Sequence, residues 1–97
     1  MNEIFFSWDK NKAKQNIKKH KVSFEEASTV FYDEKAIEYF DTVHSKSEER
    51  FLMLGLSGHL RILVVSYCVR KNGSEIRIIS ARKATQNEGK IYIEGRI

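Results

Sequence analysis

The chain has 97 residues, of which 41% are hydrophobic and 31% are charged. This is the composition of one small globular domain with a single core, so we expect one domain over residues 1–97 and no disordered chain. No apolar run approaches the roughly 20 residues that a membrane-spanning helix needs, so no membrane span is expected. The sequence contains a single cysteine, Cys68, inside an apolar stretch, so nothing indicates an oxidising compartment and a cytoplasmic location is the default expectation.

The net charge of +4 is distributed in blocks. Residues 10–21 carry six lysines and His20 without an acid, residues 23–49 carry eight acids against two lysines, and residues 50–97 carry nine basic side chains against three acids. Blocks of opposite sign predict a basic face made by the first helix and the last strands. Such a face suits nucleic acid or an acidic protein, although lysines on a helix can equally be a solvated surface.

The chain begins with a predicted short strand over residues 1–8, followed by a helix that Asp9 caps through its carboxylate. In this helix Ala13, Ile17 and His20 share one face, which predicts a buried stripe with His20 at its edge. His20 there is either a satisfied structural side chain or a functional one.

A second helix is predicted from Ser23 to about Phe31. Ser23 and Glu26 have the capping-box spacing, in which each side chain satisfies the backbone amide of the other residue. The helix should bury Phe24 and Ala27 on one face.

Four strands are predicted over residues 36–41, 50–56, 60–69 and 75–84. Asn72 and Gly73 separate the last two, and this pair predicts a type I′ hairpin turn because both residues tolerate positive φ. With such a turn, Tyr67 faces the same side of the sheet as Ile76, Ile78, Ser80 and Arg82, and Arg77 faces the other side, unless a bulge near Ser80 changes the alternation.

A last helix is predicted to begin near Thr85, which has the capping-box spacing to Glu88. Gly89 weakens this helix by about 1 kcal/mol relative to alanine. The tail over residues 89–97 is therefore expected to be marginally ordered or ordered by a partner. The whole pattern predicts an α+β fold, in which two N-terminal helices pack on an antiparallel sheet and a short helix closes the chain.

The available side chains exclude several chemistries and favour one. The three histidines lack metal-ligand spacing and one cysteine cannot build a thiolate site, so no metal or other cofactor is expected. The sequence has neither a glycine-rich phosphate loop nor a strand-turn-helix nucleophile elbow. Arg77, Arg82 and Lys83 lie on a central strand, where buried cations need carboxylates, a cleft or an anionic ligand. Arginine binds phosphate and histidine moves protons, which suits phosphodiester chemistry.

Several motifs resemble those of BrnT-type toxins over nearly the whole chain. They are Trp8 with Asp9, the run from Asn16 through His20 to Ala27, Glu49 with Arg50 before a strand, and Arg77 to Ala84 with Thr85. The resemblance implies a RelE-like α+β fold and a metal-independent ribonuclease that blocks translation. It also implies a neighbouring BrnA-like antitoxin and a toxin–antitoxin complex that binds operator DNA. Two positions depart from the family pattern, with Lys21 in place of a common glycine and Gly89 in place of a basic residue.

These observations support three classes of function. The first is a ribonuclease in which Arg50, Arg77 and Arg82 hold the phosphate and either His20 or Glu49 transfers protons. The second is a non-catalytic nucleic-acid binder or co-repressor subunit that uses the same basic face, and a surface that only receives an acidic partner is a third reading. In the first two classes the predicted nucleic-acid contacts are Lys12, Lys19, Lys83 and Tyr67, whose ring either stacks on a base or belongs to the core.

Overall fold

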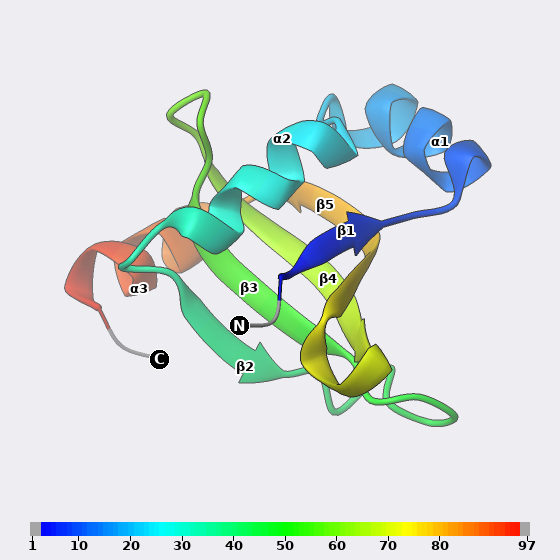
Figure 1. The fold of residues 1–97 in the computed structure, drawn as a ribbon. Coiled ribbons are helices and arrows are strands. Elements are labelled where there is room, and N and C mark those ends of the chain that lie inside the picture. The colour runs from blue at the N-terminus through cyan, green and yellow to red at the C-terminus, as the bar shows by residue number, and fades with distance from the viewer. Residues whose placement is uncertain (1–2, 96–97) are drawn as a thin grey trace.

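The computed structural model describes residues 3–95, and these form one mixed sheet with helices on both of its faces (Figure 1). In chain order the elements are β1 (Phe5–Ser7), α1 (Lys10–His20), α2 (Phe24–Thr29), the 3-10 helix η1 (Val30–Tyr32), β2 (Ile37–Phe40), β3 (Phe51–Leu56), β4 (Ile62–Arg70), the 3-10 helix η2 (Lys71–Gly73), β5 (Glu75–Lys83) and α3 (Gln86–Glu94). The predicted α+β class is confirmed.

The strand order is β1-β5-β4-β3-β2. Strands β2 to β5 form the predicted antiparallel meander, because each is joined to the next by a short connection. Strand β1 differs from the prediction, since it pairs in parallel with β5 through Phe5 opposite Glu75 and Ser7 opposite Arg77. A parallel pair needs a long crossover, and everything from α1 to β4 supplies it.

The turn between β4 and β5 has the predicted geometry. Asn72 and Gly73 both have positive φ, at 56° and 94°, and the Ser74 amide donates to the Lys71 carbonyl over 3.2 Å. This is the type I′ arrangement expected of an Asn-Gly pair. Lys71 also has a positive φ of 53°, so the left-handed segment begins one residue earlier than a minimal hairpin requires.

A β-bulge in β5 changes which side chains share a face. Tyr67 is opposite Ile78, but the preceding residue Ser66 is opposite Ser80, so Ile79 is the extra residue. Before the bulge the predicted alternation holds, with Arg77 facing away from Tyr67. After the bulge the alternation reverses, so Ser80 and Arg82 face away from Tyr67, which is the exception that the sequence analysis allowed for a bulge near Ser80.

The hydrophobic core lies between the sheet and the first two helices. On the helix side it contains Val22, Phe24, Ala27 and Val30, and on the sheet side Leu63, Val65, Tyr67, Ile76, Ile78 and Ala81. Side chains of period two from β4 and β5 meet the apolar face of α2, as an amphipathic sheet and helix require. The opposite face of the sheet is therefore not covered by α1 or α2.

Helix α1 covers the outer edge of β5 beyond the short strand β1. The side-chain NH₂ of the buried Asn16 donates to the carbonyl of Ala81 over 2.8 Å, and its side-chain oxygen accepts from the Ala81 amide over 3.1 Å. These bonds satisfy backbone groups of β5 at a point where no neighbouring strand pairs with them. The prediction that Ile17 belongs to the buried stripe is wrong, because its side chain is 47% exposed and Asn16 is buried in its place. The polar Asn16 is buried on this helix because its side chain bonds to the backbone of β5, although Ile17 is the more hydrophobic residue.

The two N-terminal helices are joined by a left-handed residue. The side chain of Asp9 caps α1 through the Asn11 amide at 2.7 Å, and the helix ends where Lys21 adopts a φ of 61°. Ser23 caps α2 by accepting from the Glu26 amide over 3.0 Å. Only this half of the predicted capping box forms, because the buried Glu26 carboxylate is bonded to Arg61 and Ser57 instead.

Helix α3 is continuous from Gln86 to Glu94, which differs from the expectation of a marginally ordered tail. The full capping box of Thr85 and Glu88 begins the helix, and Gly95 ends it with a left-handed φ of 76°. The Tyr92 hydroxyl donates to Asp33 over 2.6 Å and ties the helix to the rest of the domain. Residues 96 and 97 of the predicted tail lie outside the described residues.

Candidate phosphate-binding cleft

The sheet face that points away from α1 and α2 contains a cleft of about 360 Å³, which we call the central cleft. Strands β3, β4 and β5 provide its floor through Leu52, Ser66 and Ser80, which pair with one another across the sheet. The charged and titratable side chains that line it are His20, Asp41, His44, Arg50 and Arg82. Three of these were predicted as catalytic residues, and they come from α1, β5 and the residue before β3.

Two smaller hollows extend the central cleft across the same region. One, of about 130 Å³, is lined by the cations Lys12, Arg50, Arg70 and Arg77 and by the carboxylates of Asp9 and Glu48. The other, of about 240 Å³, is lined by Lys12, Lys19, His20 and Ser80 among others. They share Lys12 with each other, and Arg50 or His20 with the central cleft. The structure thus brings six predicted residues, His20, Arg50, Arg77, Arg82, Lys12 and Lys19, onto one continuous basic surface.

The bulge at Ile79 is the reason that Arg77 and Arg82 share this surface. Residues five positions apart on a regular strand point to opposite faces, because the side-chain period is two. The extra residue restores the match, so Arg77 opposite Cys68 and Arg82 opposite Val64 both point away from the helical layer. A chain without this bulge would direct one of the two guanidinium groups into the core.

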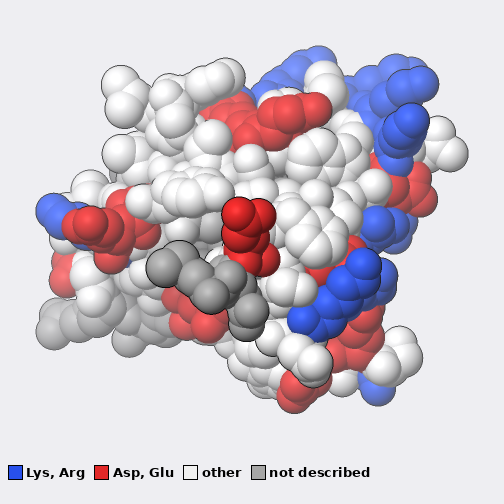
Figure 2. Space-filling view, in the orientation of Figure 1, with Lys and Arg blue, Asp and Glu red and all other residues white. Residues whose placement is uncertain are grey.

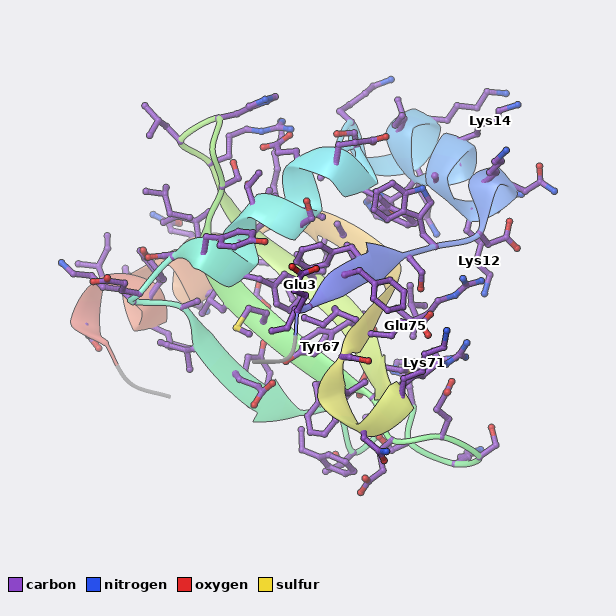
Figure 3. All side chains as sticks on the ribbon, in the orientation of Figure 1. Glu3, Lys12, Lys14, Tyr67, Lys71 and Glu75 are labelled. Atoms are coloured by element: carbon purple, nitrogen blue, oxygen red, sulfur yellow. The ribbon has the colours of Figure 1, made fainter. Side chains whose placement is uncertain are left out.

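Lysines on the first helix surround the entrance to this surface. Figure 2 shows Lys and Arg atoms gathered over α1, and Figure 3 shows Lys12 and Lys14 pointing outward from that helix. Both lysines are exposed. The predicted concentration of lysines over the first helix is therefore present, and Lys12 and Lys19 of that helix also line the hollows beside the central cleft.

Arg82 is paired with Glu88, the third residue of α3. The guanidinium donates two hydrogen bonds to this carboxylate, of 2.8 and 2.9 Å. These bonds to Arg82 hold the pKa of Glu88 at about 2, against an ordinary value of 4.5. The side chain of Arg82 nevertheless stays 41% exposed, so it also presents N–H groups to the central cleft.

Arg50 and Arg77 are partly buried and have no ion-pair partner within residues 3–95. A guanidinium without a carboxylate at the wall of a cleft is available to an incoming anion. Arg70, at the rim, is paired with Glu48 over 3.0 Å. Among the arginines that line the central cleft and these hollows, Arg50 and Arg77 are therefore the two without an ion-pair partner in the described part of the chain.

Tyr67 does not belong to this surface, and its interpretation as a base-stacking platform is wrong. The ring is 1% exposed and packs edge-on against Phe31, with ring centroids 4.8 Å apart (Figure 3). The hydroxyl donates to Glu38, and burial followed by this hydrogen bond raises the pKa of Tyr67. The ring faces the helical layer, because Tyr67 alternates along β4 with the core residues Leu63 and Val65, and it cannot meet a base there.

Two further predicted residues lie elsewhere. Glu49 is exposed and lines none of the three hollows, whereas its neighbour Glu48 does line one. Contact with the Cys68 thiol and then with the Arg70 guanidinium lowers the pKa of Glu48. Lys83 is exposed opposite the core residue Leu63, on the face away from the cleft. The structure therefore gives neither Glu49 nor Lys83 a place in the site.

Sequence reasoning missed His44 and Asp41. Both line the central cleft, and the Nδ1 atom of His44 lies 2.9 Å from the Asp41 carboxylate. They come from the polar loop between β2 and β3, in which only Glu49 and Arg50 were predicted as site residues. An aspartate three residues before a histidine at the start of a polar loop was the available signal, and it is too common by itself to identify a site.

The described residues give no support for a metal site or a membrane segment. Within residues 3–95, no three His, Cys, Asp or Glu side chains gather as a metal would require. The same part of the chain contains no helix with the length and hydropathy of a membrane span.

Comparisons with known proteins agree with this geometry. The family model described as "Ribonuclease toxin, BrnT, of type II toxin-antitoxin system" matches residues 8–88, which is most of the chain. Among solved structures, the crystal structure of the Brucella abortus ribonuclease toxin BrnT is similar, with a TM-score of 0.64 and 24% identity over 89% of this chain and 100% of that one. The search of curated proteins found no match. The family match, which spans every wall of the central cleft, shows that this chain belongs to the BrnT ribonuclease toxins of type II toxin–antitoxin systems.

Proposed function

We propose that this chain is a metal-independent endoribonuclease that cleaves RNA by transesterification within the central cleft. The observation that carries the proposal is the grouping of His20 with Arg50, Arg77 and Arg82 on one open face of the sheet. Three guanidinium groups can neutralise a phosphodiester and the additional charge of its pentacovalent transition state. A histidine at the same surface can transfer a proton to or from a ribose oxygen.

The surrounding lysines extend this function to a longer RNA strand. Lys12 and Lys19 lie along the hollows that leave the central cleft, where they would contact flanking phosphates. Such contacts supply affinity without sequence information. Cleavage of messenger RNA would block translation in the cytoplasm.

The basic surface also defines the partner that we propose. A BrnA-like antitoxin would place carboxylates against Arg50 and Arg77, whose guanidinium groups lack a described partner, and would thereby exclude RNA. Within that complex, the antitoxin would carry most of the contact with operator DNA. Amide hydrogen exchange should then show protection of β5 and of the residues before β3 on antitoxin binding. Protection confined to α2 and β2 would contradict inhibition by direct cover of the cleft.

The deciding experiment is induced expression followed by RNA analysis, together with cleavage by purified protein. We expect growth arrest, fragmented RNA in the cell, and cleavage in vitro that persists in excess chelator. Arg50→Ala should lose cleavage, and Lys90→Ala, an exposed lysine on α3, serves as the matched control. Expression without arrest and with intact RNA would favour the non-catalytic binder, and activity that is lost to chelator and restored by a divalent ion would exclude the metal-independent mechanism.

A further inference from the structure

The loop between β2 and β3 holds a histidine in a defined position at the wall of the central cleft. The Nδ1–H of His44 donates to the Asp41 carboxylate over 2.9 Å, which leaves Nε2 as the working ring nitrogen. The Asp41 side chain is only 10% exposed, whereas the His44 side chain is 62% exposed. The pair therefore consists of a buried anchor and an accessible imidazole.

The anchor is itself fixed to the base of β3. The Asp41 amide donates to the Arg50 carbonyl over 2.9 Å, and the Ser45 hydroxyl donates to the Asp41 carbonyl over 2.6 Å. The Arg50 amide in turn donates to the Ser45 hydroxyl over 2.9 Å. These bonds close the loop onto the residue that also carries a cleft guanidinium, so His44 and Arg50 are positioned by one network. Loop bracing alone does not require an imidazole, because backbone and hydroxyl groups make those bonds.

His44 and His20 reach the central cleft from opposite edges of the sheet. His20 is the last residue of α1, which covers the outer edge of β5, whereas His44 follows the edge strand β2. Strands β5, β4 and β3, which form the floor of the cleft, lie between them. Transfer at a phosphodiester proceeds in line, with the attacking and leaving oxygens on opposite sides of phosphorus. Two proton-transfer groups on opposite walls would face the two opposite sides of a phosphorus bound between them.

We propose that His44 is a second catalytic residue of the ribonuclease and that Asp41 is its positioning residue. This inference rests on the ribonuclease function proposed above. One histidine removes the proton of the ribose 2′-hydroxyl as its oxygen bonds to phosphorus. The other histidine gives a proton to the 5′-oxygen as the P–O5′ bond breaks. The products are a 2′,3′-cyclic phosphate and a 5′-hydroxyl, and no water, metal or oxidant is consumed.

Single-turnover cleavage of a short RNA by the purified full chain tests the inference. His44→Ala should slow cleavage by about 10²- to 10⁴-fold, the range for loss of a general acid or base, with little change in KM. Free imidazole should restore part of the rate, because it can occupy the vacated position and carry the proton. His59→Ala is the matched control, since His59 is similarly exposed, at 70%, but lies outside the cleft beside Glu26.

Asp41→Asn separates positioning from folding. It should lower kcat by about 10²-fold, the loss expected when a catalytic group is misplaced, while KM and the thermal midpoint stay near those of the wild type. Imidazole should not rescue it, since the ring is still present. If the wild type cleaves RNA and His44→Ala cleaves equally fast, or loses activity that imidazole cannot restore, His44 is not catalytic and the ribonuclease proposal stands. If the wild type itself cleaves no RNA, the proposed function fails first and this inference falls with it.

Discussion

The Arg82 guanidinium is held by the Glu88 carboxylate through two parallel hydrogen bonds of 2.8 and 2.9 Å. Glu88 simultaneously accepts from the Thr85 amide over 2.8 Å as part of the capping box that begins α3. One carboxylate thus fixes the start of a helix and the direction of a cleft cation. The pair has consequences both for the stability of the domain and for its chemistry.

Glu88→Gln should destabilise the domain by roughly 1 kcal/mol at neutral pH, a modest value because Arg82 is partly exposed and solvent screens the pair. Glutamine can still complete a capping box, so the change isolates the charge. The pKa of Glu88 is lowered from 4.5 to about 2 in the folded state, so its contribution is complete above about pH 4.5 and disappears as the pH falls through 2. Urea unfolding of both proteins between pH 2 and 7 should show the difference shrinking toward the acid end. Glu34→Gln, in an exposed turn, is the control, and a difference that stays constant down to pH 2 would contradict the pair's role.

Arg82→Ala should reduce RNA cleavage by about 10²-fold, comparable to the loss of one preorganised transition-state donor, while the protein stays folded. Arg82→Lys should recover little, because a lysine cannot reproduce the fork that meets both a carboxylate and a phosphate. Cleavage assays and thermal unfolding on the same preparations separate activity from stability. Lys83→Ala is the neighbouring control outside the cleft. An Arg82→Ala protein that unfolds would identify the residue as a purely structural ion-pair member, whose loss typically costs about 3–5 kcal/mol.

Tyr67→Phe should lower the free energy of unfolding by about 1 kcal/mol, because the hydroxyl that donates to Glu38 is lost while the buried ring is kept. Cleavage by the folded fraction and RNA affinity should be unchanged. Tyr32→Phe is the control, since the Tyr32 side chain is 74% exposed. Reduced RNA affinity in Tyr67→Leu without loss of stability would instead favour a stacking role.

Lys21→Gly should raise the free energy of unfolding by about 0.5–1 kcal/mol, because glycine adopts the left-handed conformation at the end of α1 without the cost that a side chain brings. The φ of 61° and the bond from Arg61 to the Lys21 carbonyl, at 3.0 Å, both remain possible with glycine. Lys18→Gly, inside the same helix, should lower stability by about 1 kcal/mol. Denaturant unfolding measures both, and a Lys21→Gly protein that is less stable than the wild type would show that the lysine side chain itself contributes there.

Local signals in the sequence predicted much of the fold. Capping residues such as Asp9 and Thr85, and the Asn72–Gly73 turn, act through backbone groups within a few residues of themselves. Their geometry is therefore encoded locally. The parallel pairing of β1 with β5 had no such local signal, because it depends on which edge of the sheet is still open after the meander has formed.

The residue types of the candidate site could be predicted from the sequence, but their arrangement in space could not. Arginine and histidine types indicated phosphate chemistry, but the faces they occupy depend on one bulge, at Ile79, that hydropathy does not reveal. Tyr67 was grouped with Arg82 because the alternation was carried unbroken across that bulge, whereas the ring belongs to the core. His44 was missed because its significance arises from proximity to Arg50 and Asp41 in space, through a loop whose sequence is only polar.

Because the first strand pairs with the last, the sheet can be completed only late in the synthesis of the chain. Ser7 bonds to Glu75, 68 positions later, and Asn16 bonds to Ala81, 65 positions later. Until β5 has left the ribosome, the N-terminal strand has no partner, the first helix has no edge to cover, and two of the three cleft arginines have not been placed. A nascent toxin of this design would thus stay inert on the ribosome that translates it, and a message truncated before β5 would encode a harmless fragment.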